Sequence, residues 1–298
     1  MSTPTAPSPL HALTERIEGL EALDGPGKAI GKQVRGALGP GTVKDLVAGT
    51  WLGHPVHPLL AQVTLGSLVS ATVLDLIGGK DGHSGADRLV AFGLLTYPAT
   101  AATGTHDYAD SEPGQDAVRR TGLVHAASNG VAATCYALSL RARKRGRRGT
   151  GTVLGLVGVS ALGLGGYLGS HLSYDEGVGV DQTTFDRGPS EWTPVLDASQ
   201  LVEGRPQRVV AGDTPVLVVR SGGAVRAIHD RCSHRGCSLS EGSIDGDVVE
   251  CGCHGSRFSL EDGSVQRGPA FASQPSFAVR EVGSRVEVRL EADGNVTS

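Results

Sequence analysis

Apolar and polar residues follow two different patterns along this chain, and the patterns divide it into a helical part and a β part. Four long apolar stretches run over residues 57–78, 89–105, 121–140 and 152–173. Each is close to the roughly 20 residues that a membrane-spanning helix needs. From residue 191 to residue 292 the apolar residues instead fall in short alternating runs, such as VVAGDTPVLVVRSG. Alternation interrupted by turn residues predicts antiparallel β-strands.

The apolar stretches predict a four-helix domain over residues 51–175. They are rich in Gly, Ala, Ser and Thr, which allow helices to pack closely in lipid, although the second stretch is short and contains Pro98. We therefore expect an α-helical four-span membrane bundle followed by an all-β, antiparallel domain. A soluble four-helix bundle is the alternative.

Polar segments flank these two domains. Residues 1–50 begin as a polar tail and continue with apolar residues at helical spacing, which predicts an amphipathic surface helix; a mobile tail is the alternative. No apolar core of a cleavable signal peptide is visible there. Residues 176–190 form a polar linker, and residues 293–298 form a short tail.

Four of the five cysteines lie in one short region, RCSHRGCSLSEGSIDGDVVECGCHGSRF, residues 231–258. It contains two boxes, Cys232-Ser233-His234 and Cys251-Gly252-Cys253-His254, and 16 residues separate His234 from Cys251. Thiolates and imidazoles in paired boxes are typical metal ligands. Zinc is the first candidate, but zinc fingers tend to pair Cys with Cys and His with His, whereas each box here offers one of each.

The two boxes, followed by Gly268-Pro269-Ala270, resemble the Rieske family, in which two Cys hold one iron of a [2Fe-2S] cluster and two His hold the other. The resemblance covers the whole β segment. It implies that the cluster ligands are Cys232, His234, Cys251 and His254; a structural zinc site is the alternative.

The remaining two cysteines also have a counterpart in this family. In Rieske proteins that resemble the cytochrome bc type, the positions of Cys237 and Cys253 form a disulfide between the cluster loops. The resemblance therefore implies that disulfide here, and two free thiols are the alternative.

Three residues near the boxes bear on the redox potential and the partner. The resemblance implies that Ser256 donates a hydrogen bond to a cluster sulfur, whereas Phe258 replaces a Tyr that is a second donor in high-potential relatives. Because such donors tune the potential, we expect an intermediate value. Arg235 stands where quinol-oxidising relatives have an apolar residue, which favours a soluble, acidic redox partner. We expect His229, before the first box, to be a surface residue of a strand.

Histidines of the helical part fall at one end of every predicted span. If the spans alternate in direction, the ends near residues 57, 106, 121 and 173 share one side, called side A. The histidines at side A are His54, His57, His106, His125 and His171, and the candidate site residues among them are His57, His106, His125 and His171. Ionisable groups at membrane depth are usually functional. We weigh a haem b, with His125 and His171 as the preferred axial pair, against another metal, a quinone site and purely structural roles.

The segments GHPVHP, TGTHDY, VHAASN and GYLGSH resemble a small bacterial membrane domain of uncharacterised function, over roughly residues 45–182. That domain often precedes a Rieske domain in one chain. The resemblance implies a multi-pass protein of the bacterial cell membrane and supplies little chemistry.

Charge indicates the orientation of the predicted spans. The net charge is −4, which argues against a nucleic-acid partner. Side B carries Lys80, Arg88, Arg141, Arg143, Lys144, Arg145, Arg147 and Arg148. Side A carries Lys44, Arg119, Arg120 and Arg187. The positive-inside rule then makes side B cytoplasmic and puts the β domain outside, where a disulfide persists.

Arg147-Arg148 is compatible with twin-arginine export of a folded domain, although the apolar residues that usually follow the pair are missing. A basic cytoplasmic loop, with the β domain in the cytoplasm, is the alternative.

Together these features predict a membrane-anchored one-electron carrier that exchanges electrons with a soluble or membrane partner, including haem or quinone at side A. A quinol-oxidising respiratory subunit and a redox sensor based on Cys237 and Cys253 are the alternatives. We expect an electron-transfer component and not a stand-alone oxygenase, because no domain with a 2-His-1-carboxylate iron site is visible.

Overall fold

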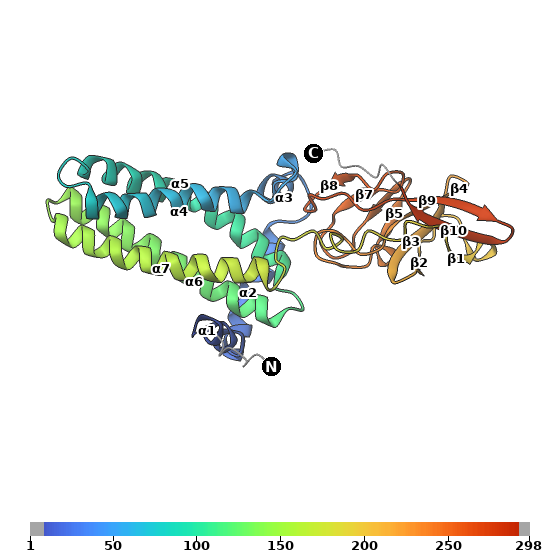
Figure 1. Cartoon of the computed structure of the whole chain (residues 1–298), viewed down its shortest axis with the longest axis horizontal. Helices are drawn as coiled ribbons and strands as arrows, with labels where there is room; N and C mark the ends of the chain where they lie inside the picture. The colour runs from blue at the N-terminus through green and yellow to red at the C-terminus, as the bar shows by residue number, and fades with distance from the viewer. Residues whose placement is uncertain (1–8, 292–298) are drawn as a thin grey trace, which may run out of the picture. The chain divides into compact units, whose positions relative to one another are not determined.

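The computed structural model describes residues 9–291 and divides the chain into two compact units (Figure 1). The helical unit comprises the chain up to Leu38 together with Val56–Val178. The β unit comprises Gly39–Pro55 together with the chain from Gly179 onward. The segment Gly39–Pro55 therefore belongs to the β unit, although its sequence suggested a tail and the start of the helical domain. The predicted tail at 293–298 lies outside the described residues.

The helical unit contains four long helices at the positions of the four apolar stretches. Its elements are α1 (Pro9–Glu18), η1 (Glu21–Leu23), α2 (Asp24–Ala37), α4 (Val56–Ile77), α5 (His83–Ser111), α6 (Asp116–Lys144) and α7 (Arg148–Tyr174). Figure 1 shows α4 beside α5 and α6 beside α7. Helix α5 continues through Pro98 and extends well beyond the predicted stretch.

Two of the four long helices, α4 and α7, are long and apolar enough to cross a membrane. Helices α5 and α6 carry more charged and polar residues near their ends, so they do not reach the same hydropathy. These two helices are thus candidate membrane spans by length and composition, and the number of crossings stays a prediction.

Small residues allow the long helices to pack closely. A Cβ atom added to Gly93 of α5 would lie 2.7 Å from Leu68 of α4, and one added to Gly158 of α7 would lie 3.0 Å from Tyr136 of α6. Leu68 and Tyr136 are the fully buried centre of this unit. The glycine-rich composition therefore serves helix–helix contact, as is common in membrane bundles.

A charge network joins all four long helices at side B. Asp75 of α4 and Arg143 of α6 form an ion pair, and both side chains are only 1% exposed. Arg148 of α7 lies 2.7 Å from Asp75 and 2.6 Å from Asp87 of α5. Buried charges need such partners, so this network fixes the turns between the helices. The second arginine of the Arg147-Arg148 pair thus has a structural role here.

The β unit holds α3 (Thr42–Ala48) and η2 (Thr50–Leu52) from its first segment and antiparallel strands from its second. The strands are β1 (Thr193–Asp197), β2 (Gln207–Ala211), β3 (Thr214–Ser221), β4 (Ala224–His229), β5 (Ser243–Asp245), β6 (Val248–Glu250), β7 (Arg257–Ser259), β8 (Val265–Arg267), β9 (Phe277–Val282) and β10 (Arg285–Leu290). They form sheets in the orders β1-β10-β9, β2-β3-β4 and β5-β6-β7-β8. Short 3-10 turns lie at Ala198–Gln200 and Leu239–Glu241.

Strand β3 connects the two hydrophobic cores of the β unit. Val216 and Val218 point into one core, with Phe277, whereas Leu217 and Val219 point into the other. This is the two-residue period of a strand that is buried on both faces. The second core includes Cys232 and Cys251, the first cysteine of each box, so the sheets position the site directly.

Candidate metal centre

Two loops of the same construction carry the two boxes. In the first loop, after β4, the amide of Cys232 donates to the carbonyl of Cys237 at 2.8 Å, and the amide of Gly236 donates to the carbonyl of Cys232. In the second loop, after β6, Cys251 and Gly255 make the same pair of bonds, with Ser256 as the acceptor from Cys251. Gly236 and Gly255 both have positive φ, of 78° and 81°, which glycine adopts without strain.

The cysteine at the start of each loop points inward. Cys232 is 1% exposed and Cys251 is 2% exposed. The thiol of Cys232 donates a hydrogen bond to the Cys251 sulfur, and this bond, with burial, raises the pKa of Cys232. The same hydrogen bond lowers the pKa of Cys251 to about 7. Two adjacent buried thiols are well suited to a metal, which binds them as thiolates and releases their protons.

The two histidines lie together at the tips of the loops. The rings of His234 and His254 have centroids 4.9 Å apart and stand nearly perpendicular, at 86°. Both residues are half-buried, in contrast to the two cysteines. The loops therefore offer a buried sulfur side and a more exposed imidazole side.

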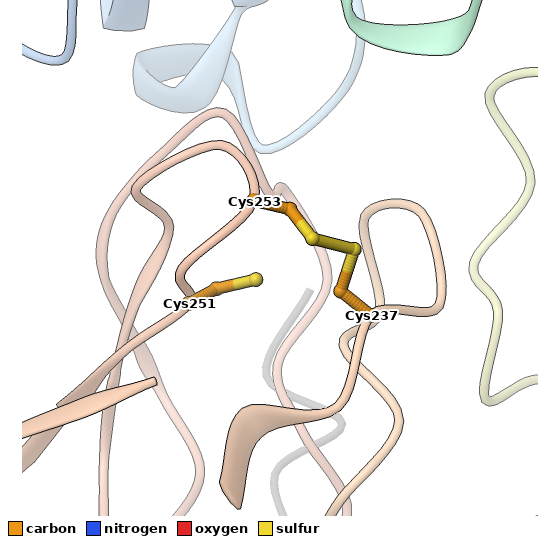
Figure 2. A group of neighbouring side chains, drawn as sticks. All are labelled: Cys237, Cys251 and Cys253. Atoms are coloured by element: carbon orange, nitrogen blue, oxygen red, sulfur yellow. A yellow bond between two sulfur atoms is a disulfide. The ribbon is translucent and has the colours of Figure 1, made fainter. Parts of the chain in front are cut away.

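A disulfide joins the two loops between Cys237 and Cys253 (Figure 2). The Cys251 sulfur lies within 4.8 Å of both disulfide sulfurs. This is the pairing that the resemblance implied. The donor set of two buried thiols and two adjacent imidazoles fits a [2Fe-2S] cluster with mixed ligation.

Comparison with known proteins matches each unit to a family. Residues 191–278 match the Rieske [2Fe-2S] domain, and residues 53–182 match the predicted membrane protein family DUF2231. The ferredoxin component of biphenyl 2,3-dioxygenase from Rhodococcus jostii is 37% identical over 106 residues, which are 36% of this chain and 97% of that protein. The chain belongs to the Rieske [2Fe-2S] family.

Other relatives of this Rieske protein are also ferredoxins. The anthranilate 1,2-dioxygenase ferredoxin subunit from Burkholderia cepacia is 33% identical over 101 residues, covering 34% of this chain and 94% of the relative. Ferredoxin CarAc from Metapseudomonas resinovorans is 40% identical over 89 residues, covering 30% of this chain and 83% of the relative. The β unit is thus an electron-carrier domain of the Rieske type, which implies a [2Fe-2S] cluster.

The three residues expected near the cluster lie close to the loops of this Rieske protein. Ser256 is fully buried, and its hydroxyl oxygen accepts a hydrogen bond from the amide of Ala270 at 3.0 Å. The hydroxyl hydrogen is therefore available to a second acceptor. Phe258 is fully buried in the same core as Cys232 and Cys251. Arg235, at the tip of the first loop, is half-buried.

The expectation for His229 is wrong, because this residue is fully buried. Its Nδ1 accepts a hydrogen bond from the amide of Arg231 at 3.0 Å, and its Nε2 lies 3.5 Å from the carboxylate of Asp186. Its own amide donates to the carbonyl of Pro275. Asp186 and Pro275 come from distant parts of the chain, so strand alternation could not reveal the burial.

Acidification should destabilise the β unit through His229. Burial lowers the pKa of His229, although Asp186 partly offsets this. The unfolded chain then binds a proton near pH 6.5 and the folded chain only at lower pH, so stability falls as the pH drops below about 6.5. We expect His229→Asn, whose side-chain oxygen can still accept from Arg231, to show a smaller drop in Tm between about pH 7.5 and 5.5. Unfolding is monitored by the fluorescence of Trp192 in a Trp51→Phe background. An unchanged drop in Tm would exclude His229 as the cause.

The four candidate histidines of side A make separate contacts. His57 Nδ1 lies 3.0 Å from the carbonyl of Thr100, and a Cβ on Gly104 would lie 2.6 Å from the His57 ring. His106 Nδ1 lies 3.1 Å from Asp107 on its own helix. The imidazole of His57, in the GHPVHP segment, therefore packs against Gly104, in the TGTHDY segment of α5.

The other two histidines contact different elements. His125 Nδ1 lies 2.7 Å from the carbonyl of Gly165 on α7, and its Nε2 lies 3.2 Å from Asn129. His171 Nε2 lies 2.8 Å from Glu18 of α1. Both ring nitrogens of His125 are engaged, whereas an axial haem ligand needs one for iron. The prediction of haem b is therefore not supported, and these motif residues serve helix packing.

Proposed function

We propose that this protein is a membrane-anchored one-electron carrier whose [2Fe-2S] cluster is held by Cys232, His234, Cys251 and His254. The observation that carries the proposal is the joint geometry of the loops, which bring two buried sulfurs and two imidazoles together. The similarity to dioxygenase ferredoxins supports it. When bound, such a cluster supplies one-electron transfer at a potential of about −150 to +300 mV.

The loops determine where electrons enter and leave. Cys232 and Cys251 are buried within the second core, so water and partner proteins cannot reach them. The imidazole side, with His234 and His254, is the part near solvent. Electron exchange therefore takes place at the histidine edge, where distance to a partner is shortest.

A soluble, acidic redox protein is the partner that this edge fits best. Arg235 contributes a positive charge beside His234, and opposite charges speed and orient encounter. The relatives are named as ferredoxin components of oxygenases, which exchange electrons with other proteins. These observations favour a carrier over a quinol-oxidising subunit, and the proposal includes neither haem nor quinone.

The helical unit anchors the protein by crossing the membrane four times. Large apolar side chains are exposed along all four long helices; examples are Ile77 (79% exposed), Leu95 (75%), Val131 (52%) and Val153 (60%). Such an extended apolar surface favours lipid contact over a soluble bundle. The match to a predicted membrane protein family supports the same conclusion.

The Rieske unit lies outside the cytoplasm, and the Cys237–Cys253 disulfide is the main support for this orientation, because disulfides persist in oxidising compartments. The charge argument is weaker than the sequence suggested. Helix α2 brings Lys28, Lys32 and Arg35 to side A, where Arg35 lies 2.8 Å from Glu112 just beyond α5. The predicted excess of basic residues at side B therefore nearly disappears.

A redox titration of the detergent-purified full chain tests this function. Visible absorbance should follow a reversible one-electron curve with a midpoint in the range of about −150 to +300 mV. An acidic reduced ferredoxin should then pass its electron to the oxidised protein more slowly as salt rises, because the encounter is charge-assisted. Irreversible bleaching, or no redox-active absorbance, would refute the proposal.

Adding a hydroxyl next to the cluster should raise the potential. Phe258 of β7 lies between Val249 and Val265 of neighbouring strands, in the core of Cys232 and Cys251. In Phe258→Tyr, a hydrogen bond worth about 1 kcal/mol to a cluster sulfur in the reduced form would raise the potential by about 40 mV.

The same substitution at Phe277, in the other core, is the matched control and should leave the potential unchanged. An unchanged or lower potential in Phe258→Tyr would mean that the missing hydroxyl does not set the potential of this protein.

A further inference from the structure

Residues 42–52, which form α3 and η2, have one face against the Rieske loops and one face that no described residue covers. On the inner face, Lys44 is only 5% exposed and its Nζ lies 3.4 Å from the carbonyl oxygen of His254. Ala48, one turn further along α3, is also buried. The segment thus touches the loop that carries a proposed cluster ligand.

Glycines of the Rieske loops make room for this inner face. A Cβ atom on Gly255 would lie 3.0 Å from Pro40, and one on Gly268 would collide with the hydroxyl of Thr50. His54, just beyond η2, has its ring centroid 6.2 Å from that of Phe271. The segment is therefore fitted to the second loop and to the neighbouring Gly268–Phe271 turn along its whole length.

The outer face is apolar and exposed. Its large side chains are Val43 (63% exposed), Leu46 (61%), Trp51 (66%) and Leu52 (40%). The indole nitrogen of Trp51 donates to the carbonyl of Leu46 at 3.1 Å, so the exposed ring does not need water for its only polar group. Four such side chains in an eleven-residue segment form a patch that is unusual for a surface in water.

The position of this patch in the chain indicates what covers it. Only residues 53–55 separate η2 from Val56, where α4 begins, and α4 is one of the two helices apolar enough to cross a membrane. Tryptophan is enriched at membrane–water interfaces, and short amphipathic segments lie in the interface with their apolar face inward. The patch is continuous in sequence with the membrane anchor.

We infer that residues 42–52 form an interfacial anchor, whose outer face enters the headgroup region of the lipid bilayer while its inner face holds the second cluster loop. The inference rests on the membrane anchorage in the proposed function. It adds that the Rieske unit is seated on the membrane surface through its cluster end. A soluble partner then reaches the cluster from the side of the first loop, which carries Arg235.

Fluorescence quenching in liposomes tests the anchor on the full chain. The variant Trp192→Phe leaves Trp51 as the only tryptophan. It is reconstituted into phosphatidylcholine–phosphatidylglycerol vesicles that carry a nitroxide either just below the headgroup or near the end of the acyl chain. The shallow nitroxide should remove most of the Trp51 emission, the deep nitroxide should remove less, and aqueous acrylamide should have little effect.

The variant Trp51→Phe is the matched control, because its remaining Trp192 lies against the guanidinium groups of Arg280 and Arg289, at 4.3 and 4.7 Å from the ring centroid. Neither nitroxide should quench it. Emission of Trp51 that responds to acrylamide and not to either nitroxide would overturn the inference. Protection of Trp51 from acrylamide that appears only at high protein density would also overturn the inference, because it would indicate a second copy of the chain on the patch. Protection that appears only when a soluble redox protein is added would overturn it as well.

Extraction of the same vesicles with alkaline carbonate separates two kinds of failure. Protein that stays in the vesicles without quenching of Trp51 would refute the interfacial anchor and leave the proposed function intact. Protein that is released would refute membrane anchorage and the inference together.

Discussion

Replacing Cys232 with serine should remove the [2Fe-2S] cluster, so that bound iron falls to near zero and the visible absorbance disappears. Cys232 is 1% exposed and its thiol lies beside that of Cys251, so no water or neighbouring ligand can take its place. A serine hydroxyl does not supply the soft thiolate that iron–sulfur clusters need. Iron content per chain and the absorbance spectrum of the purified full chain measure the effect.

The matched control is Cys135→Ser. Cys135 lies in α6 and is the only cysteine outside the Rieske unit, so this variant should keep its full iron content. Iron retained in Cys232→Ser, or lost in Cys135→Ser, would contradict the ligand assignment. Stoichiometric zinc in place of iron in the parent protein would contradict it as well.

Loss of the loop disulfide should be the second large effect. Cys237 and Cys253 are 16 residues apart, and a disulfide that closes a loop of this size stabilises a protein by about 3 kcal/mol in the chain-entropy model. We expect this loss in iron-free Cys237→Ser/Cys253→Ser protein. The loss should be smaller with the cluster bound, because the cluster ties the same loops together.

Urea unfolding in detergent, followed by Trp192 in a Trp51→Phe background, measures this difference. Trp192 stacks with Arg280 and Arg289 of β9 and β10, so its emission reports on the Rieske unit. Cys135→Ser is again the control and should unfold like the parent. Equal stability of the iron-free parent and the disulfide variant would show that this bond does not constrain the unfolded chain.

Local patterns were sufficient to predict the long helices and the site loops. The stretch predicted at residues 57–78 is α4, Val56–Ile77, because a long uninterrupted apolar run favours a single helix. The alternating run around residues 214–221 is β3, with both faces buried. The paired boxes lie on loops after β4 and β6. This could be predicted because the turn residues and the Cys and His ligands are neighbours in the sequence.

Long-range contacts could not be predicted from such patterns. Helix α5 extends to Ser111 because its polar end is paired: Glu112, just beyond it, lies 2.8 Å from Arg35 and from Arg119. The inner face of α3 contacts residues more than 200 positions away, as Lys44 does with the carbonyl of His254. A seven-residue helix without a strong hydrophobic period gives no hint of that partner.

The histidines of the helical unit show how a repeated residue type can mislead. Four imidazoles at one predicted membrane face suggested a shared cofactor. In the structure His57 contacts Thr100, His125 contacts Gly165 and His171 contacts Glu18. Each ring bridges a different pair of elements, and an imidazole can satisfy a backbone carbonyl as readily as a metal.

Pulsed EPR of dithionite-reduced full-length protein, labelled with ¹⁵N at histidine, is the most direct test of the central claim. The account predicts a [2Fe-2S] signal with couplings to two histidine nitrogens, which change from the ¹⁴N to the ¹⁵N pattern on labelling and disappear together with the Rieske signal in His254→Ala. A [2Fe-2S] signal without histidine nitrogen couplings, or no iron–sulfur signal at all, would contradict it.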